Sequence, residues 1–98
     1  MNPESRIEQA FCRWCASKSI PCLKVQAIGV RGFPDRLVLL QGKVVFIEFK
    51  TPTGVLSEHQ IRCHNRLKAL GLDIHVCRSK EEAINVIENI ARLPETRR

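Results

Sequence analysis

The chain has 98 residues, 44% of them hydrophobic and 27% charged, which allows one buried core and leaves no room for a separate recognition domain. No apolar run reaches membrane-spanning length and the amino terminus has no signal-peptide core, so we expect a single domain over residues 1–98 in the cytoplasm. A formal net charge of +6 and a pI near 9.4 favour a polyanionic partner such as nucleic acid.

The first predicted element is an amphipathic helix. Two starts fit the sequence: Asn2 followed by Pro3, or a capping box made by Ser5 and Glu8. Apolar residues then recur at the three- and four-residue spacing of one helix face: Ile7, Ala10, Phe11, Trp14 and Cys15. A helix with this pattern buries one side against the rest of the fold.

Three strands are expected next. Residues 22–28, CLKVQAI, mix apolar and polar positions as a half-buried strand does, and a loop flanked by Gly29 and Gly32 follows. Residues 36–40, RLVLL, and 43–49, KVVFIEF, are apolar on both faces. This pattern predicts a hairpin in the middle of a sheet that is covered on both sides.

A second helix is predicted after a short connection. Ser57 and Gln60 have the spacing of a capping box, in which each side chain bonds the backbone of the other. The helix is expected to run to about Leu70 and to end at Gly71, because glycine readily adopts the backbone conformation that closes a helix.

The chain is expected to finish with a strand and a helix. Residues 72–77, LDIHVC, supply a strand that returns to the sheet through the helical crossover. Ser79 and Glu82 form another capping box, and Pro94 stops the final helix. The apolar face of that helix is made by Ala83, Ile84, Val86, Ile87, Ile90 and Ala91.

The hairpin brings acidic residues together. A two-residue turn at positions 41–42 sets Asp35 directly opposite Glu48, and Lys50 points to the same face because strand side chains alternate. Facing carboxylates repel each other unless a cation lies between them. Paired hard oxygens suit Mg²⁺ or Mn²⁺, so the hairpin predicts a divalent-cation site.

The sequence PD at 34–35 followed by EFK at 48–50 resembles the PD-(D/E)xK signature of metal-dependent nucleases. Over residues 8–90 the chain is similar to stand-alone VRR-NUC domains, the virus-type replication and repair nuclease modules, in its leading acidic helix, its G-x-P-D and E-x-K strands and its S-x-x-Q helix start. The resemblance implies an α/β fold with a restriction-endonuclease-like αβββαβ(α) core, in which helices flank a mixed central sheet.

The resemblance also implies roles for the motif residues. Asp35 and Glu48 hold the metal, the backbone carbonyl of Phe49 adds a ligand, and Lys50 assists the attack on the phosphate. A divalent ion in such a site polarises a phosphate oxygen and activates water near neutral pH. The expected reaction is therefore Mg²⁺- or Mn²⁺-dependent hydrolysis of a DNA phosphodiester bond.

Two further residues have both a catalytic and a structural interpretation. The resemblance implies that Glu8 acts on the metal directly or through water, whereas the sequence also allows it to be the acidic arm of the Ser5 capping box. It likewise implies that Gln60 faces the active site, whereas the capping box with Ser57 gives it a purely structural role.

Basic residues are expected to contact the DNA backbone, although solvated surface positions explain them equally well. The candidates are Arg31, Arg36, Lys24, Arg62 and Arg66. The family resemblance implies a phage-borne enzyme acting in the bacterial host cytoplasm and similar to Holliday junction resolvases. Because cutting two strands symmetrically requires two active sites, a homodimer acting on branched DNA is expected.

Other functions remain open from the sequence. The chain also fits a flap or nicking nuclease without junction preference, or a catalytically silent nucleic-acid-binding module. The C-x-x-C spacing at 12–15, with His59 and Cys63, offers a zinc-stabilised adaptor as the third class. Five cysteines in all fit free thiols of the cytosol, and His64 and His75 are expected at surface or sheet positions.

Overall fold

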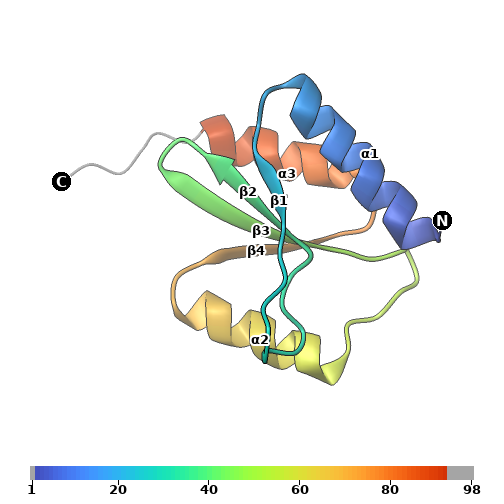
Figure 1. Cartoon of the computed structure of the whole chain (residues 1–98), viewed down its shortest axis with the longest axis vertical. Coiled ribbons are helices and arrows are strands. Elements are labelled where there is room, and N and C mark those ends of the chain that lie inside the picture. The colour runs from blue at the N-terminus through green and yellow to red at the C-terminus, as the bar shows by residue number, and fades with distance from the viewer. Residues whose placement is uncertain (1, 93–98) are drawn as a thin grey trace.

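The structure is a computed structural model that describes residues 2–92 (Figure 1). Its elements follow the αβββαβα order expected from the sequence and from the family resemblance. They are α1 (Pro3–Ser17), β1 (Cys22–Lys24), β2 (Arg36–Leu40), β3 (Lys43–Phe49), α2 (Glu58–Ala69), β4 (Asp73–Cys77) and α3 (Lys80–Arg92). The predicted stop at Pro94 lies outside the described residues.

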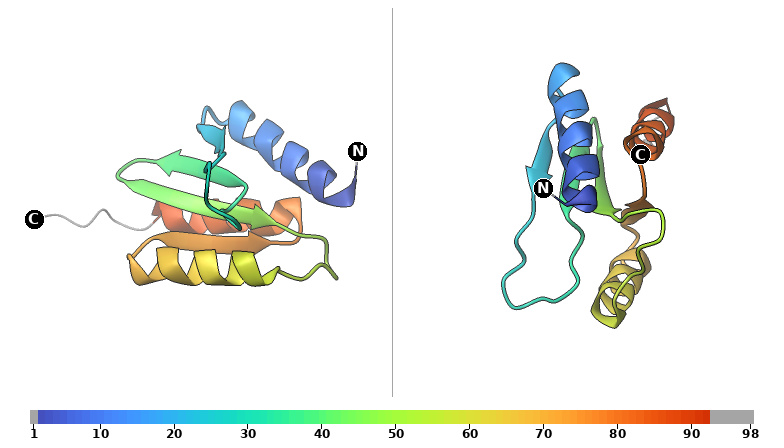
Figure 2. Two further views of the ribbon diagram at one scale, coloured as in Figure 1. Left: turned by 60° about the horizontal axis from the view of Figure 1, so that its bottom comes forward. Right: turned by 90° about the vertical axis from the view of Figure 1, so that its right-hand side faces the viewer.

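The strands form one mixed sheet in the order β1-β2-β3-β4. The first three strands pair antiparallel, whereas β4 returns parallel to β3 after the α2 crossover. Helices α1 and α3 lie on one face of the sheet and α2 on the other (Figures 1 and 2). The mixed, helix-flanked α/β fold is therefore confirmed.

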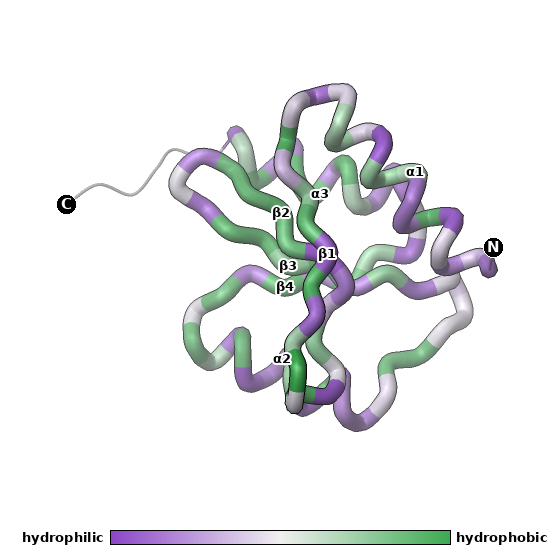
Figure 3. Tube along the Cα trace, viewed as in Figure 1, coloured by the Kyte–Doolittle hydropathy of each residue, from purple (hydrophilic) through white to green (hydrophobic). Residues whose placement is uncertain are grey.

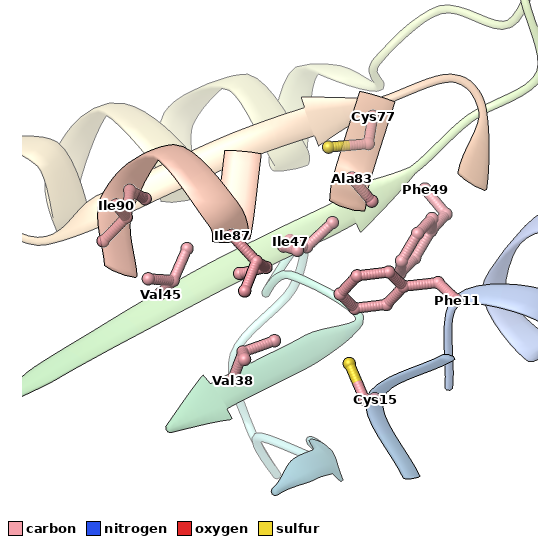
Figure 4. Close-up of a cluster of buried hydrophobic side chains, with 10 residues drawn as sticks. All are labelled: Phe11, Cys15, Val38, Val45, Ile47, Phe49, Cys77, Ala83, Ile87 and Ile90. Atoms are coloured by element: carbon pink, nitrogen blue, oxygen red, sulfur yellow. The ribbon is translucent and has the colours of Figure 1, made fainter. Parts of the chain in front are cut away.

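The main core lies between the sheet and the α1–α3 layer (Figure 4). The hydropathy colouring shows that β2 and β3 are mostly hydrophobic (Figure 3), and residues 45–49 of β3 are all buried. Leu39 and Val44, near the hairpin turn, remain 37% and 40% exposed. The prediction of cover on both faces therefore holds for the centre of the hairpin and is wrong for this end.

The hairpin has the predicted register. Leu40 pairs with Lys43 across the turn, and the ladder continues to Arg36 opposite Ile47. Gly42 in the turn has a φ of +71°, a conformation that glycine adopts without strain. One step beyond the ladder, the same register sets Asp35 opposite Glu48, where the Phe49 amide donates a hydrogen bond to Asp35 Oδ2 at 2.8 Å.

The structure decides between the two predicted starts of α1, and it shows that the predicted extent of β1 is wrong. Asn2 caps α1, since its side chain accepts a hydrogen bond from the Ser5 amide at 2.8 Å, so the alternative start with Glu8 as a capping residue is wrong. Strand β1 ends at Lys24 rather than at residue 28. The chain leaves the sheet there because the β1–β2 connection runs down to α2 (Figure 1).

Capping also shapes the other helices. Both hydrogen bonds of the predicted Ser57–Gln60 box are present at the start of α2. At the start of α3, the Glu82 amide donates to Ser79 Oγ at 3.0 Å, while the Glu82 carboxylate accepts from the Arg78 amide at 2.7 Å.

No helix in residues 2–92 has both the length and the apolarity that a bilayer span requires.

Candidate active site

The motif residues lie on the face of the sheet that α2 covers. Asp35 precedes β2, Glu48 lies near the end of β3, and Lys50 follows β3. Glu48 is only 2% exposed, whereas Asp35 and Lys50 are half-buried. Asp35 lies opposite Glu48 in the hairpin, and Lys50 is close enough for its positive charge to influence the Glu48 carboxyl. The structure therefore brings the three residues together, as the hairpin predicts.

The protonation state of Glu48 is unusual. Burial, followed by the negative charge of Asp35, raises the pKa of the Glu48 carboxyl to about 8. The charge of Glu4 in α1 acts in the same direction. Glu48 is therefore mostly protonated at pH 7 until a cation compensates the paired charge.

Gln60 performs both of the roles that the sequence left open. Its side-chain oxygen accepts a hydrogen bond from the Ser57 amide at 2.9 Å, which completes the cap of α2. Its side-chain nitrogen donates to Glu48 Oε2 at 2.9 Å. The two ends of one amide therefore tie the start of α2 to the acidic residue of β3.

His64 was expected at a surface or sheet position, and this expectation is wrong. It lies on α2, one turn after Gln60, with 3% exposure, and its Nε2 is 3.8 Å from Glu48 Oε1. Burial, and then the charge of Lys68, lowers the pKa of His64, so the contact is not an ion pair at neutral pH. Glu48 Oε1 and His64 Nε2 are both buried without a hydrogen-bond partner. His75 does occupy a sheet position, on β4.

Substituting Gln60 and Ser57 separates the two roles of the cap. Each of Gln60→Ala and Ser57→Ala removes part of the capping box and should lower the free energy of unfolding by about 1 kcal/mol. Only Gln60→Ala also removes the donor to Glu48, so it alone should weaken Mg²⁺ binding, by about 10- to 100-fold. Calorimetric titration with Mg²⁺ and thermal melting measure both effects, and equal Mg²⁺ affinities in the two variants would contradict the assigned contact.

Glu8 lies in a different environment from the motif carboxylates. Arg36 Nε and Lys24 Nζ both donate to Glu8 Oε2, at 2.7 and 3.0 Å. Two predicted DNA contacts are therefore already paired with an acidic partner, and Arg36 is only 14% exposed. The catalytic role of Glu8 stays a prediction. Glu4, one helical turn earlier, is the α1 residue whose charge affects Glu48.

The remaining predicted DNA contacts converge on one surface. Arg31 of the β1–β2 connection and Arg62 and Arg66 of α2 line a pocket of about 210 Å³. His59, also on α2, lies between two of them. We refer to these four residues as the arginine pocket. The sequence spacing of these basic residues did not show that Arg31 meets Arg62 and Arg66 in space.

The zinc alternative is not supported by the fold. Cys12 and Cys15 lie on α1, whereas His59 and Cys63 lie on α2, across the sheet. Cys12 Sγ instead contacts Cys22 Sγ of β1 at 3.8 Å. Within residues 2–92, no three His, Cys, Asp or Glu side chains are grouped so that they would hold a metal ion. The expectation of free thiols agrees with the structure.

The motif residues nevertheless fit a hard divalent cation. Two adjacent carboxylates and a strand carbonyl are oxygen ligands of the kind that Mg²⁺ and Mn²⁺ prefer. The buried Glu48 Oε1 atom has no hydrogen-bond partner, which leaves it available as a ligand. Because Mg²⁺ usually keeps several waters, two carboxylates are enough for such a site.

Comparison with known proteins bears on the family and the fold of the chain. The sequence profile of the VRR-NUC domain matches residues 5–81. A solved structure of a "VRR_NUC domain" superimposes with a TM-score of 0.80 at 27% identity and covers 90% of this chain and 97% of that chain. "Putative nuclease p44" of Acyrthosiphon pisum secondary endosymbiont phage 1 is 46% identical over 54 residues, which span 54% of this chain and 58% of that protein. The chain belongs to the VRR-NUC family.

Proposed function

We propose that the chain is a Mg²⁺- or Mn²⁺-dependent endonuclease that hydrolyses phosphodiester bonds of DNA, and that residues 1–98 act as one nuclease domain. The observation that carries the proposal is the buried pairing of Asp35 with Glu48, with Lys50 beside them. Two carboxylates held this close in a low-dielectric site are unfavourable by themselves, and their arrangement is useful when a cation binds between them. The family match and the phage relative support the same class of reaction.

Each residue of the site has a defined task in this proposal. Asp35, Glu48 and the Phe49 carbonyl would hold the cation, which when bound supplies Lewis-acid polarisation of the phosphate and activation of water. Gln60 fixes one oxygen of Glu48 so that the other stays available. Lys50 would offset the negative charge that develops on the phosphate in the transition state.

We further propose that the substrate is branched DNA, four-way junctions above all, and that the active form is a homodimer. Residues 2–92 provide one sheet and three helices and no additional module that reads base edges, which favours recognition of DNA shape. The described chain carries one Asp35–Glu48 pair, so two copies are needed to cut two strands of a junction symmetrically.

Cleavage assays on a panel of DNAs test the proposal. We expect Mg²⁺- or Mn²⁺-dependent cutting of four-way junctions in preference to flap, splayed and linear duplexes, and a dimer mass by light scattering. Asp35→Asn should abolish cutting and retain DNA binding, whereas the control Asp73→Asn, at an exposed position of β4, should cut normally. Binding without cleavage under all conditions would favour the silent binding module, and equal cutting of all DNAs would contradict junction selectivity.

A further inference from the structure

The arginine pocket has an excess of hydrogen-bond donors. None of its described lining residues is acidic. Arg62 has one carboxylate neighbour outside the pocket, Glu58 at 3.6 Å, but both side chains are largely exposed and such a pair contributes little. Guanidinium groups only donate hydrogen bonds, so three of them in one pocket leave donors that the protein does not satisfy.

The contacts of His59 show this excess of donors over acceptors. Arg31 Nη1 is 3.0 Å from its Nε2 atom, and Arg62 Nη2 is 3.3 Å from its Nδ1 atom. An imidazole ring accepts at most one hydrogen bond, because its other nitrogen carries a proton. His59 therefore accepts from at most one of the two guanidinium groups, which leaves the donors of the other open to water or to a bound acceptor.

The position of the pocket relates it to the motif residues. His59 precedes Gln60, which contacts Glu48, and Arg31 lies four residues before Asp35 on the same connection. The two segments are held together where Gly32 packs against the backbone of residues 59 and 60. A group bound in the pocket is consequently held at a fixed offset from the carboxylate pair.

We propose that the arginine pocket binds a phosphate group of the DNA other than the phosphate that is cleaved. This inference rests on the proposed function, and it adds a second contact that sets the position of the cut. Arginine matches the oxygens of phosphate bidentately, and a volume of about 210 Å³ accommodates more than a simple halide ion. The phosphate is either an internal diester or a terminal monoester.

The test measures DNA binding in EDTA, where cleavage does not interfere. The pocket variant is Arg62→Gln combined with Arg66→Gln. The control, Arg13→Gln combined with Arg92→Gln, removes the same charge from exposed positions of α1 and α3, on the other face of the sheet. Loss of one phosphate contact should weaken binding about tenfold or more and reduce the slope of log K against log salt by about 0.9. The control should show a smaller loss and an unchanged slope.

Modified DNAs identify the source of the phosphate. If the pocket binds a terminal monoester, wild type should prefer DNA with a terminal phosphate over DNA with a terminal hydroxyl, and the pocket variant should lose that preference. If it binds an internal diester, a neutral methylphosphonate at one fixed offset from the cut should weaken binding to wild type and leave binding to the pocket variant unaffected.

The outcomes separate this inference from the proposed function. Equal affinities and salt slopes in the pocket and control variants would overturn the phosphate site even if the protein cuts DNA. A pocket-specific loss in a protein that never cuts DNA would support the site and contradict the nuclease proposal. Thermal melting of both variants verifies that they are folded, and broadened cut positions in the pocket variant would add support from a second measurement.

Discussion

Replacing Glu48 with glutamine should abolish DNA cleavage and, in the absence of divalent cations, stabilise the protein. Glutamine has the shape of a protonated glutamate and can donate a hydrogen bond to Asp35, but it supplies no negative charge to a cation. Loss of one electrostatic stabiliser of the transition state typically lowers the rate by about 10²- to 10³-fold, and a cation ligand should cost at least as much.

The gain in stability follows from the raised pKa of Glu48. The unfolded chain releases this proton near pH 4.5, whereas the folded protein holds it up to about pH 8. Between these values the folded state binds more protons than the unfolded state, so the free energy of unfolding falls as the pH rises. The contribution of Glu48 is fully present below pH 4.5 and is lost as the pH rises through about 8. Glutamine avoids this loss.

Thermal melting of Glu48→Gln in EDTA at pH 5, 7 and 9 measures the effect. The melting temperatures of variant and wild type should be similar at pH 5, and the variant should melt several degrees higher at pH 9, since 1 kcal/mol corresponds to about 4–8 °C in a domain of this size. Mg²⁺ should raise the melting temperature of wild type only. Glu88→Gln, on the exposed side of α3, should follow wild type throughout. Parallel pH profiles for Glu48→Gln and wild type would contradict the assignment.

The pairing of the motif carboxylates was predictable because it depends on local rules. A two-residue turn fixes the hairpin register, and the period of two along a strand then determines which side chains share a face. It was harder to predict that α2 covers the face of the sheet that carries Glu48, because this depends on how a helix packs across the sheet. Even so, the assignment of Gln60 to the site implied that His64 also lies there, since residues four apart share a helix face.

Contacts between distant segments were not predictable from the sequence. Glu8 was assigned to the cation site or to a cap, and its actual partners, Lys24 and Arg36, come from two strands whose placement against α1 the sequence does not specify. The arginine pocket likewise joins residue 31 to residues 62 and 66. The pocket forms because the β1–β2 connection leaves the sheet and approaches α2 closely. The sequence pattern suggested a longer β1 and therefore did not predict where the chain leaves the sheet.

The last prediction concerns this close approach: Gly32→Ala should strongly destabilise the protein and impair the site. Gly32 has a φ of +81°, and a Cβ atom there would lie 2.4 Å from the backbone carbonyl of His59 and 2.5 Å from the Gln60 amide nitrogen. Backbone atoms at a helix start cannot yield as a flexible side chain does. Backbone strain and overlap together should lower the free energy of unfolding by about 2–5 kcal/mol.

Gly29→Ala is the matched control, because Gly29 lies in the same connection with a φ of +83° and a Cβ atom there would meet nothing within 4 Å. It should cost only the conformational strain, about 1–2 kcal/mol. Chemical denaturation compares the two variants, and Mg²⁺ titration of the folded fraction should show weaker binding in Gly32→Ala alone, because moving residues 59 and 60 displaces the amide that holds Glu48. If both variants lose the same stability and bind Mg²⁺ equally, the contact between Gly32 and α2 does not hold the site together.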